Sequence, residues 1–159
     1  MSLRIRAGGP DDAATLAELH PYVHDLHVAA RPDFFAVPRR DDVAAWFREQ
    51  IARADVQTWL GELDGAPAGY TLVYFHERPA RPFAHARRWC EIDQIAVAPA
   101  GRRRGVARAL IQAALDEAGR RGIRDIELSS WAFNTPAHEV FRRIGFTPKV
   151  IRFERFLPA

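Results

Sequence analysis

The sequence predicts one mixed α/β domain that covers residues 1–159. Some segments alternate apolar and polar residues, as β-strands do, and others repeat apolar residues at the spacing of an amphipathic helix. A strand–helix–strand order over residues 92–130 predicts a parallel crossover joined to an otherwise antiparallel sheet. With 48% hydrophobic and 27% charged residues, the chain can build one core, which excludes disorder as its main state.

The first third of the chain predicts a strand and three helices. Residues 3–7 alternate between apolar side chains and arginines, as in a half-buried strand. Residues 9–12 combine a proline with two acidic residues, as at the start of a helix. Apolar residues follow helical spacing over residues 16–30, and Pro21 is expected to divide this run into two helices. A third, short helix is predicted over residues 41–51.

The middle of the chain predicts three strands. Residues 56–63 and 68–75 flank the turn sequence Asp-Gly-Ala-Pro, which is a hairpin signal. A polar loop with prolines over residues 77–88 leads into a further strand over residues 89–97.

The last third predicts a helix, a strand, a second helix and a final strand. The first helix covers residues 105–120 and is closed by Gly122, since glycine is typical just after a helix C-terminus. A strand over residues 123–131, a helix over 136–144 and a strand over 145–156 complete the predicted fold.

Charge and hydropathy argue against two classes of protein. The formal net charge is +3, and Lys149 is the only lysine among 23 basic residues. Arginines suit forked contacts with phosphates and carboxylates, but this net charge is too small to indicate a nucleic-acid-binding protein. No apolar run approaches the ~20 residues that cross a bilayer. The first residues lack a signal-type segment, so we expect a cytoplasmic protein with no membrane partner.

Cysteine and histidine usage argues against a bound metal. Cys90 is the only cysteine, which excludes an internal disulfide and a cysteine-cluster metal site. It lies in an apolar strand-like run, which favours a packed structural thiol over a nucleophile. His20, His24 and His27 would share one face of a continuous helix. Because Pro21 interrupts that helix and no H-E-x-x-H motif accompanies the histidines, we expect no metal site.

Residues 95–108 combine a strand, a basic loop with glycines and the start of a helix. Such a loop can direct successive backbone N–H groups at one point, where the helix dipole adds positive potential. Gly105 lets a ligand approach the backbone closely, so a phosphate or pyrophosphate is the expected guest. The alternative is a tight turn with exposed arginines. The chain contains neither G-x-x-x-x-G-K-[ST] nor G-x-G-x-x-G, which argues against the nucleotide-binding loops that carry those motifs.

Two motifs in the second half of the chain carry a family resemblance. Residues 102–107 fit [QR]-x-x-G-x-[GA], and a second element matches in order and spacing at Asn134, Ala137, Phe141 and Gly145-Phe146. With these motifs the chain resembles the acetyl-CoA-dependent N-acetyltransferases of the GNAT superfamily, as a single GNAT domain over residues 1–159. The resemblance implies a mostly antiparallel mixed sheet, with a central parallel pair splayed to hold acetyl-CoA and helices on both faces. It also implies an enzyme that uses acetyl-CoA as cosubstrate and acetylates a primary amine of a small molecule or of a protein.

The resemblance further implies how acetyl-CoA would bind. The backbone of Ile95, Ala96 and Val97 would pair with the amide groups of the pantetheine arm, as an added strand does. Asn134 would hydrogen-bond the pantetheine side, although it also suits a helix N-cap, and Phe141 would pack near the sulfur. The pyrophosphate would lie on the backbone of the basic loop, with side-chain contacts from its arginines. This loop site consists of Arg102, Arg103, Arg104, Gly105, Val106, Ala107 and Arg108.

Acetyl transfer to an amine needs a proton acceptor and stabilisation of an oxyanion. Strict alternation along the strand puts Glu91, Asp93 and Val97 on one face. Several members of the resembled family use a glutamate at the position of Glu91, directly or through water, which makes Glu91 the first candidate base and Asp93 the second. The alternative for Glu91 is a surface-exposed or salt-bridged acid, with Arg87 or Arg88 as the nearby partner. The backbone N–H of Val97 is the candidate oxyanion donor.

Phe141 departs from the family pattern, in which a tyrosine often protonates the leaving sulfur. Phenylalanine cannot donate a proton. Three outcomes stay open: the thiolate leaves unassisted, a water or another residue such as His138 donates, or the protein is a non-catalytic acyl-CoA-binding or sensing module.

Acceptor specificity is expected from the first helices and from the loop over residues 76–88. In the helices, the three histidines would face the acceptor or solvent, and the Arg-Pro-Asp-Phe-Phe sequence at 31–35 would supply charge and an aromatic wall. These residues suggest a small amine with an apolar or carboxylate-bearing part. Many proteins of the resembled family dimerise, so a homodimer is expected.

Overall fold

The computed structural model describes residues 1–159, which form two compact units, Met1–Ser129 and Ser130–Ala159. The first unit contains a five-stranded sheet in the order β1-β2-β3-β4-β5. Neighbouring strands from β1 to β4 are antiparallel, and β4 and β5 are parallel, which confirms the predicted mixed sheet. The strands are β1 (Leu3–Ala7), β2 (Val56–Leu63), β3 (Ala66–Arg78), β4 (Arg87–Val97) and β5 (Ile126–Leu128).

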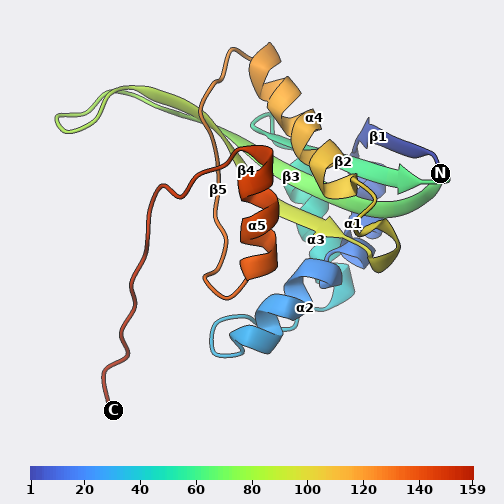
Figure 1. Cartoon of the computed structure of the whole chain (residues 1–159), viewed down its shortest axis with the longest axis horizontal. Helices are drawn as coiled ribbons and strands as arrows, with labels where there is room; N and C mark the ends of the chain where they lie inside the picture. The colour runs from blue at the N-terminus through green and yellow to red at the C-terminus, as the bar shows by residue number, and fades with distance from the viewer. The chain divides into compact units, whose positions relative to one another are not determined.

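Helices cover both faces of this sheet, as predicted (Figure 1). On one face, Leu16 and Phe47 are fully buried against apolar side chains of β2 and β3. On the other face, the side chains of Val106 and Leu110 lie over Gly69 of β3. No helix of the chain is both long enough and apolar enough to span a bilayer. The helices of this unit are α1 (Ala13–Leu19), α2 (Pro21–Ala30), α3 (Arg40–Ile51) and α4 (Val106–Arg120).

Two boundaries follow directly from local chemistry. α1 ends at Leu19 and α2 begins at Pro21, because proline fits a first helical turn but cannot continue an existing helix. β2 and β3 are joined by Asp64 and Gly65, whose φ values of 50° and 82° fit the two-residue turn that matches strand twist.

The β3–β4 hairpin is longer than the sequence predicts. The segment expected as a loop over residues 77–88 is partly strand, since β3 runs to Arg78 and β4 starts at Arg87. Ring stacking between His76 and Trp89, with centroids 4.7 Å apart, supports the hairpin there. Figure 1 shows this hairpin reaching beyond the rest of the sheet at the upper left.

A pair of glycines brings α4 close to the sheet. Gly61 and Gly69 are opposite each other in β2 and β3. A Cβ atom on either glycine would lie 3.1 Å from Cγ1 of Val106, the first residue of α4. At Gly69 it would also lie 2.6 Å from the carbonyl oxygen of Ala96. Because both residues lack a side chain, the N-terminus of α4 can pack closely on the sheet.

The second unit consists of α5 (Thr135–Ile144) and the residues around it. None of its residues is buried, and Ile151 and Phe153 are 73% and 92% exposed. The predicted final strand over residues 145–156 is wrong: β-branched and aromatic residues favour a strand only where a neighbouring strand pairs with it. No strand follows β5 in the sheet. The parallel pair therefore lies at the end of the sheet, whereas a central position was expected.

Candidate functional site

The loop between β4 and α4 has an unusual backbone conformation. A short 3-10 turn at Pro99–Gly101 follows β4, and the loop then passes through Arg103 with a φ of 57° and Gly105 with a φ of 79°. Both φ values lie in the left-handed region, which costs a residue with a Cβ atom but not glycine. Gly105 takes the N-cap position of α4 and provides no side chain to cap it.

Five backbone N–H groups of this loop and of the first turn of α4 have no hydrogen-bond acceptor in the chain. The N–H of Arg104 donates to the carbonyl of Gly101, 3.3 Å away, and is the one loop donor between residues 103 and 108 that is occupied. The first N–H groups of a helix have no intrahelical partner, and the 15-residue helix α4 adds the positive end of its dipole. The open donors belong to Arg103, Gly105, Val106, Ala107 and Arg108.

Four arginine side chains surround these donors. All four are exposed, and none of them forms an ion pair or a side-chain hydrogen bond in the structure. Unpaired guanidinium groups beside open N–H donors suit a phosphate, whose oxygens accept several charge-assisted hydrogen bonds. The four are Arg102, Arg103, Arg104 and Arg108.

The strand that leads into this loop is unpaired on one side. Pairing of β4 with β5 ends at Ile92 and Leu128. The following residues of β4, including Ile95, Ala96 and Val97, pair with β3 alone. Their free backbone edge can therefore accept an extended ligand in the manner of strand addition.

A β-bulge lies in the middle of β4. Leu72 of β3 is opposite Gln94, but the next residue, Val73, is opposite Ile92. Asp93 therefore has no opposite residue and is the extra residue of the bulge.

The bulge changes which side chains share a face. Glu91 and Gln94 each lie opposite a residue of β3 that packs in the core under α1 and α3. Val97 instead lies opposite Gly69, on the face of the sheet that α4 covers. The prediction that Glu91 and Val97 share a face is wrong, because one extra residue at Asp93 resets the alternation.

Glu91 forms a hydrogen bond with a histidine. Oε2 of Glu91 lies 3.2 Å from Nε2 of His76 on β3. The expected partners of Glu91, Arg87 and Arg88, are wrong, because Glu91 is paired with His76. Arg87 binds Asp125 at 2.5 Å and Glu127 at 2.6 Å, and Arg88 donates to a backbone carbonyl.

Asp93 is exposed and forms no ion pair. Partial desolvation of its carboxyl group, followed by the charge of Glu91, raises its pKa. Burial, followed by the charge of Asp93, raises the pKa of both Tyr70 and Tyr74, so Asp93 lies near these two side chains.

Gln94 is a site residue that the sequence analysis missed. Its Oε1 accepts a hydrogen bond of 2.7 Å from the hydroxyl of the buried Tyr70. Tyr74 likewise donates to Oε1 of Gln50 on α3, at 2.9 Å. No sequence signal indicates these contacts, since each depends on the register of β3 against its neighbours.

Cys90 is fully buried, which confirms the predicted structural thiol. Burial raises the pKa of the Cys90 thiol to about 11, so the group stays protonated and unreactive at neutral pH.

The first helices bring the predicted histidines into ring contacts. His20 and His24 are stacked with centroids 4.7 Å apart, and His27 stacks on Phe35 at 5.0 Å. Arg31 forms an ion pair with Asp33, which neutralises the charge expected from this segment. No three His, Cys, Asp or Glu side chains gather in an arrangement that could hold a metal ion.

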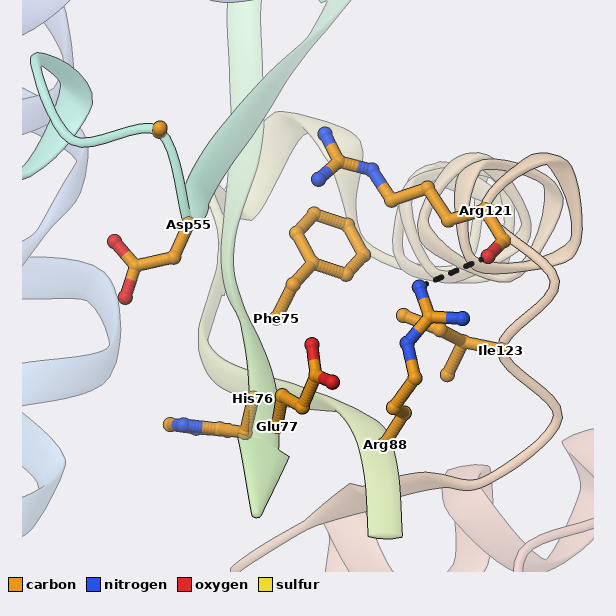
Figure 2. A pocket seen from close by; sticks show the side chains of 8 residues that line it. Asp55, Phe75, His76, Glu77, Arg88, Arg121 and Ile123 are labelled. Atoms are coloured by element: carbon orange, nitrogen blue, oxygen red, sulfur yellow. Dashed lines mark hydrogen bonds between the residues drawn. The ribbon is translucent and has the colours of Figure 1, made fainter. Parts of the chain in front are cut away.

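A pocket of about 260 Å³ lies between the β3–β4 hairpin and the C-terminal end of α4 (Figure 2). The guanidinium carbon of Arg121 is 3.8 Å from the ring centroid of Phe75, and Arg88 donates to the Arg121 carbonyl at 3.2 Å. Asp55 and Glu77 also line this pocket. Its arginines are engaged within the chain, so it is a weaker anion site than the loop.

The second unit contains two of the predicted cofactor residues. Asn134 occupies the N-cap position of α5, but its side chain makes no capping hydrogen bond. Phe141 is half-buried and packs edge-on against Phe146, with centroids 6.3 Å apart. His138 is hydrogen-bonded through Nε2 to the Trp131 carbonyl at 3.0 Å. The cofactor roles of Asn134 and Phe141 stay predictions.

Comparison with known proteins agrees with these features. The family model described as acetyltransferase (GNAT) matches residues 21–146. An uncharacterized N-acetyltransferase of Methanocaldococcus jannaschii is 30% identical over 112 residues, or 68% of this chain and 47% of the relative. The chain thus spans about half the length of that curated relative.

Two solved structures show the same fold. A tetramutant of a Bacillus halodurans protein is 21% identical, with a TM-score of 0.91 over 97% of this chain and 99% of that chain. An aminoglycoside N-acetyltransferase in complex with CoA is 20% identical, with a TM-score of 0.76 over 97% of this chain and 95% of that chain.

Proposed function

The chain belongs to the acetyltransferase (GNAT) family, and we propose that it is an enzyme that transfers an acetyl group from acetyl-CoA to a primary amine by direct attack. The observation that carries this proposal is the set of open N–H donors at the α4 N-terminus, ringed by unpaired arginines. Those donors fit a pyrophosphate in number and charge. They lie at the end of the unpaired stretch of β4, which suits the pantetheine arm.

The residues that would hold acetyl-CoA divide by the part of the molecule they contact. The loop N–H groups and arginines would bind the diphosphate, and the free edge of β4 from Ile95 to Val97 would bind the pantetheine amides. Asn134 and Phe141 are proposed for the pantetheine side and the sulfur.

Glu91 is the proposed general base, with Asp93 as the other candidate. In the reaction the amine nitrogen attacks the thioester carbonyl carbon, the C–S bond breaks, and the proton lost from nitrogen goes to a carboxylate. The hydrogen bond from His76 orients Glu91 for this task. Burial raises the pKa of the Asp93 carboxyl group, which favours proton uptake by Asp93. The N–H of Val97 is proposed to stabilise the oxyanion.

No acid for the leaving sulfur is assigned, because phenylalanine stands at position 141. A thiol pKa of roughly 8.5 permits departure as thiolate near neutral pH. The same residue favours the second candidate function, a non-catalytic acyl-CoA-binding or sensing module. The cytoplasmic location and the homodimer expected from the sequence stay proposals.

Thiol release from acetyl-CoA in the presence of a panel of primary amines tests the proposed function. We expect release that depends on the amine and gives an N-acetyl product by mass spectrometry. Binding of acetyl-CoA with no turnover for any amine would favour the sensing module, and no binding at all would reject both functions.

A further inference from the structure

A cavity of about 310 Å³ lies between α3 and β4, and the proposed cofactor contacts leave it unused. Its size is near the lower end of the ~300–1,000 Å³ that small-molecule sites occupy, so it suits a small ligand. Its lining is mainly apolar and comes from the end of α1, the segment before α3, α3 itself and β4. The lining residues are His20, Pro38, Asp42, Val43, Trp46 and Gln94.

The cavity lies on the same sheet face as the candidate bases. Gln94 lines it and is adjacent in the chain to Asp93. Because of the bulge, Gln94 also shares its face with Glu91. A ligand in the cavity is therefore on the side of β4 from which a proton can pass to these carboxylates.

Trp46 forms a fixed aromatic wall of the cavity. Its ring packs edge-on against Phe47, with centroids 5.2 Å apart, and Phe47 is fully buried. Phe47 in turn packs edge-on against Tyr70 at 5.5 Å. An indole held in this way can contact methylene groups and can also bind a cation over its face.

Asp42 is the only charged group in the lining at neutral pH. It is exposed and has no ion-pair partner. Burial, followed by the charge of His24, lowers the pKa of His20 to about 4, so His20 is uncharged and does not repel a cation. The side chain of Gln94 is already engaged, since its oxygen accepts from Tyr70 and its amide group interacts with Asp93.

We propose that this cavity binds a linear aliphatic diamine as the acetyl acceptor. One ammonium group binds Asp42 and the face of Trp46, the methylene chain packs on Trp46 and Val43, and the second amine lies towards Glu91 and Asp93 and is acetylated. This inference rests on the proposed acetyl transfer. A single carboxylate and few polar groups fit one anchoring ammonium and a methylene chain better than a hydroxyl-rich polycation such as an aminoglycoside.

A matched pair of acceptors tests the inference. 1,5-Diaminopentane and pentylamine share one chain length and differ only in the anchoring ammonium. We expect kcat/KM to be about tenfold higher for the diamine in the wild-type protein, since one charge-assisted contact distinguishes the two. In D42N the ratio should fall close to one, with the KM for acetyl-CoA unchanged.

D41N is the matched control, because Asp41 is also exposed in the first turn of α3 but does not line the cavity. We expect D41N to keep the wild-type ratio. Equal kcat/KM for the two acceptors in the wild type, or preferred acetylation of an aminoglycoside such as sisomicin, would overturn the inference and leave the proposed function intact. Absence of acetylation for every amine would instead reject the proposed function.

Discussion

In the β3–β4 hairpin, Nε2 of His76 lies 3.2 Å from Oε2 of Glu91. The imidazole is stacked between Tyr74 and Trp89, with ring centroids 5.9 and 4.7 Å away, which limits its rotation. The contact therefore holds the Glu91 carboxylate in one orientation. Asp93 has no imidazole partner and interacts instead with the side chain of the adjacent Gln94. This difference separates the two candidate bases.

E91Q is expected to lower kcat by roughly 10²–10⁴, which is the usual contribution of a positioned general base. The variant keeps the shape of the side chain but cannot accept the proton. The measurement is the pH dependence of kcat with acetyl-CoA and a reactive amine, and E91Q should lose the acidic limb of that profile.

D93N is the matched variant for the second candidate. If D93N loses the acidic limb and E91Q keeps it, Asp93 is the base and the role given to Glu91 is wrong. Both variants should retain the wild-type affinity for CoA, which a calorimetric titration checks.

Replacement of Gly69 by alanine tests the packing of α4 on the sheet. The new Cβ atom would lie 2.6 Å from the Ala96 carbonyl and 3.1 Å from Val106. Because a backbone atom cannot move aside cheaply, we expect G69A to lower the free energy of unfolding by ~1–3 kcal/mol. Urea denaturation measures this change.

G119A serves as the control, since a Cβ atom on this α4 residue meets nothing within 4 Å. Alanine is a better helix former than glycine, so G119A should raise the free energy of unfolding by ~0.5–1 kcal/mol. Equal effects of the two substitutions would contradict the packing described for Gly69.

The free energy of unfolding is expected to depend on pH through His20. Its folded-state pKa of about 4 is below the ordinary value of 6.5, so the unfolded chain binds a proton that the folded chain does not. The stability that this group contributes is fully present above pH 6.5 and is lost as the pH falls towards 4. Urea unfolding of wild type and H20Q between pH 7.5 and 4.5 should show a steeper loss for the wild type, and parallel curves would refute the depressed pKa.

The thiol of Cys90 is expected to react slowly with thiol reagents in the folded protein. Its thiol is buried and its pKa is raised to about 11, so little thiolate is present at pH 8. We expect a disulfide reagent to label Cys90 at the rate of unfolding and to label it rapidly in urea. Fast labelling of the native protein would show that the thiol is accessible.

Local patterns predicted most of the first unit. Alternation located β1 to β4, the apolar spacing and Pro21 located α1 and α2, and Gly122 closes α4 with a φ of 69°. These features depend on residues close in sequence, which is why they can be read from the chain. The basic loop belongs to the same class, because its donors come from the backbone that follows one strand.

Features that depend on pairing could not be predicted. No sequence pattern indicates the bulge at Asp93, yet the bulge places Glu91 on the cavity side of β4. His76 meets Glu91 only because of the strand register. The expected strand over residues 145–156 failed for a related reason: Ile151 and Phe153 have strand propensity, but no strand pairs with them.

The diphosphate site at the α4 N-terminus is tested most directly by calorimetric titration with CoA and with pantetheine, which lacks the phosphates. We expect saturable binding of CoA and at least about 100-fold weaker binding of pantetheine, because several charge-assisted hydrogen bonds are lost. No binding of CoA, or equal affinity for the two compounds, would contradict this expectation.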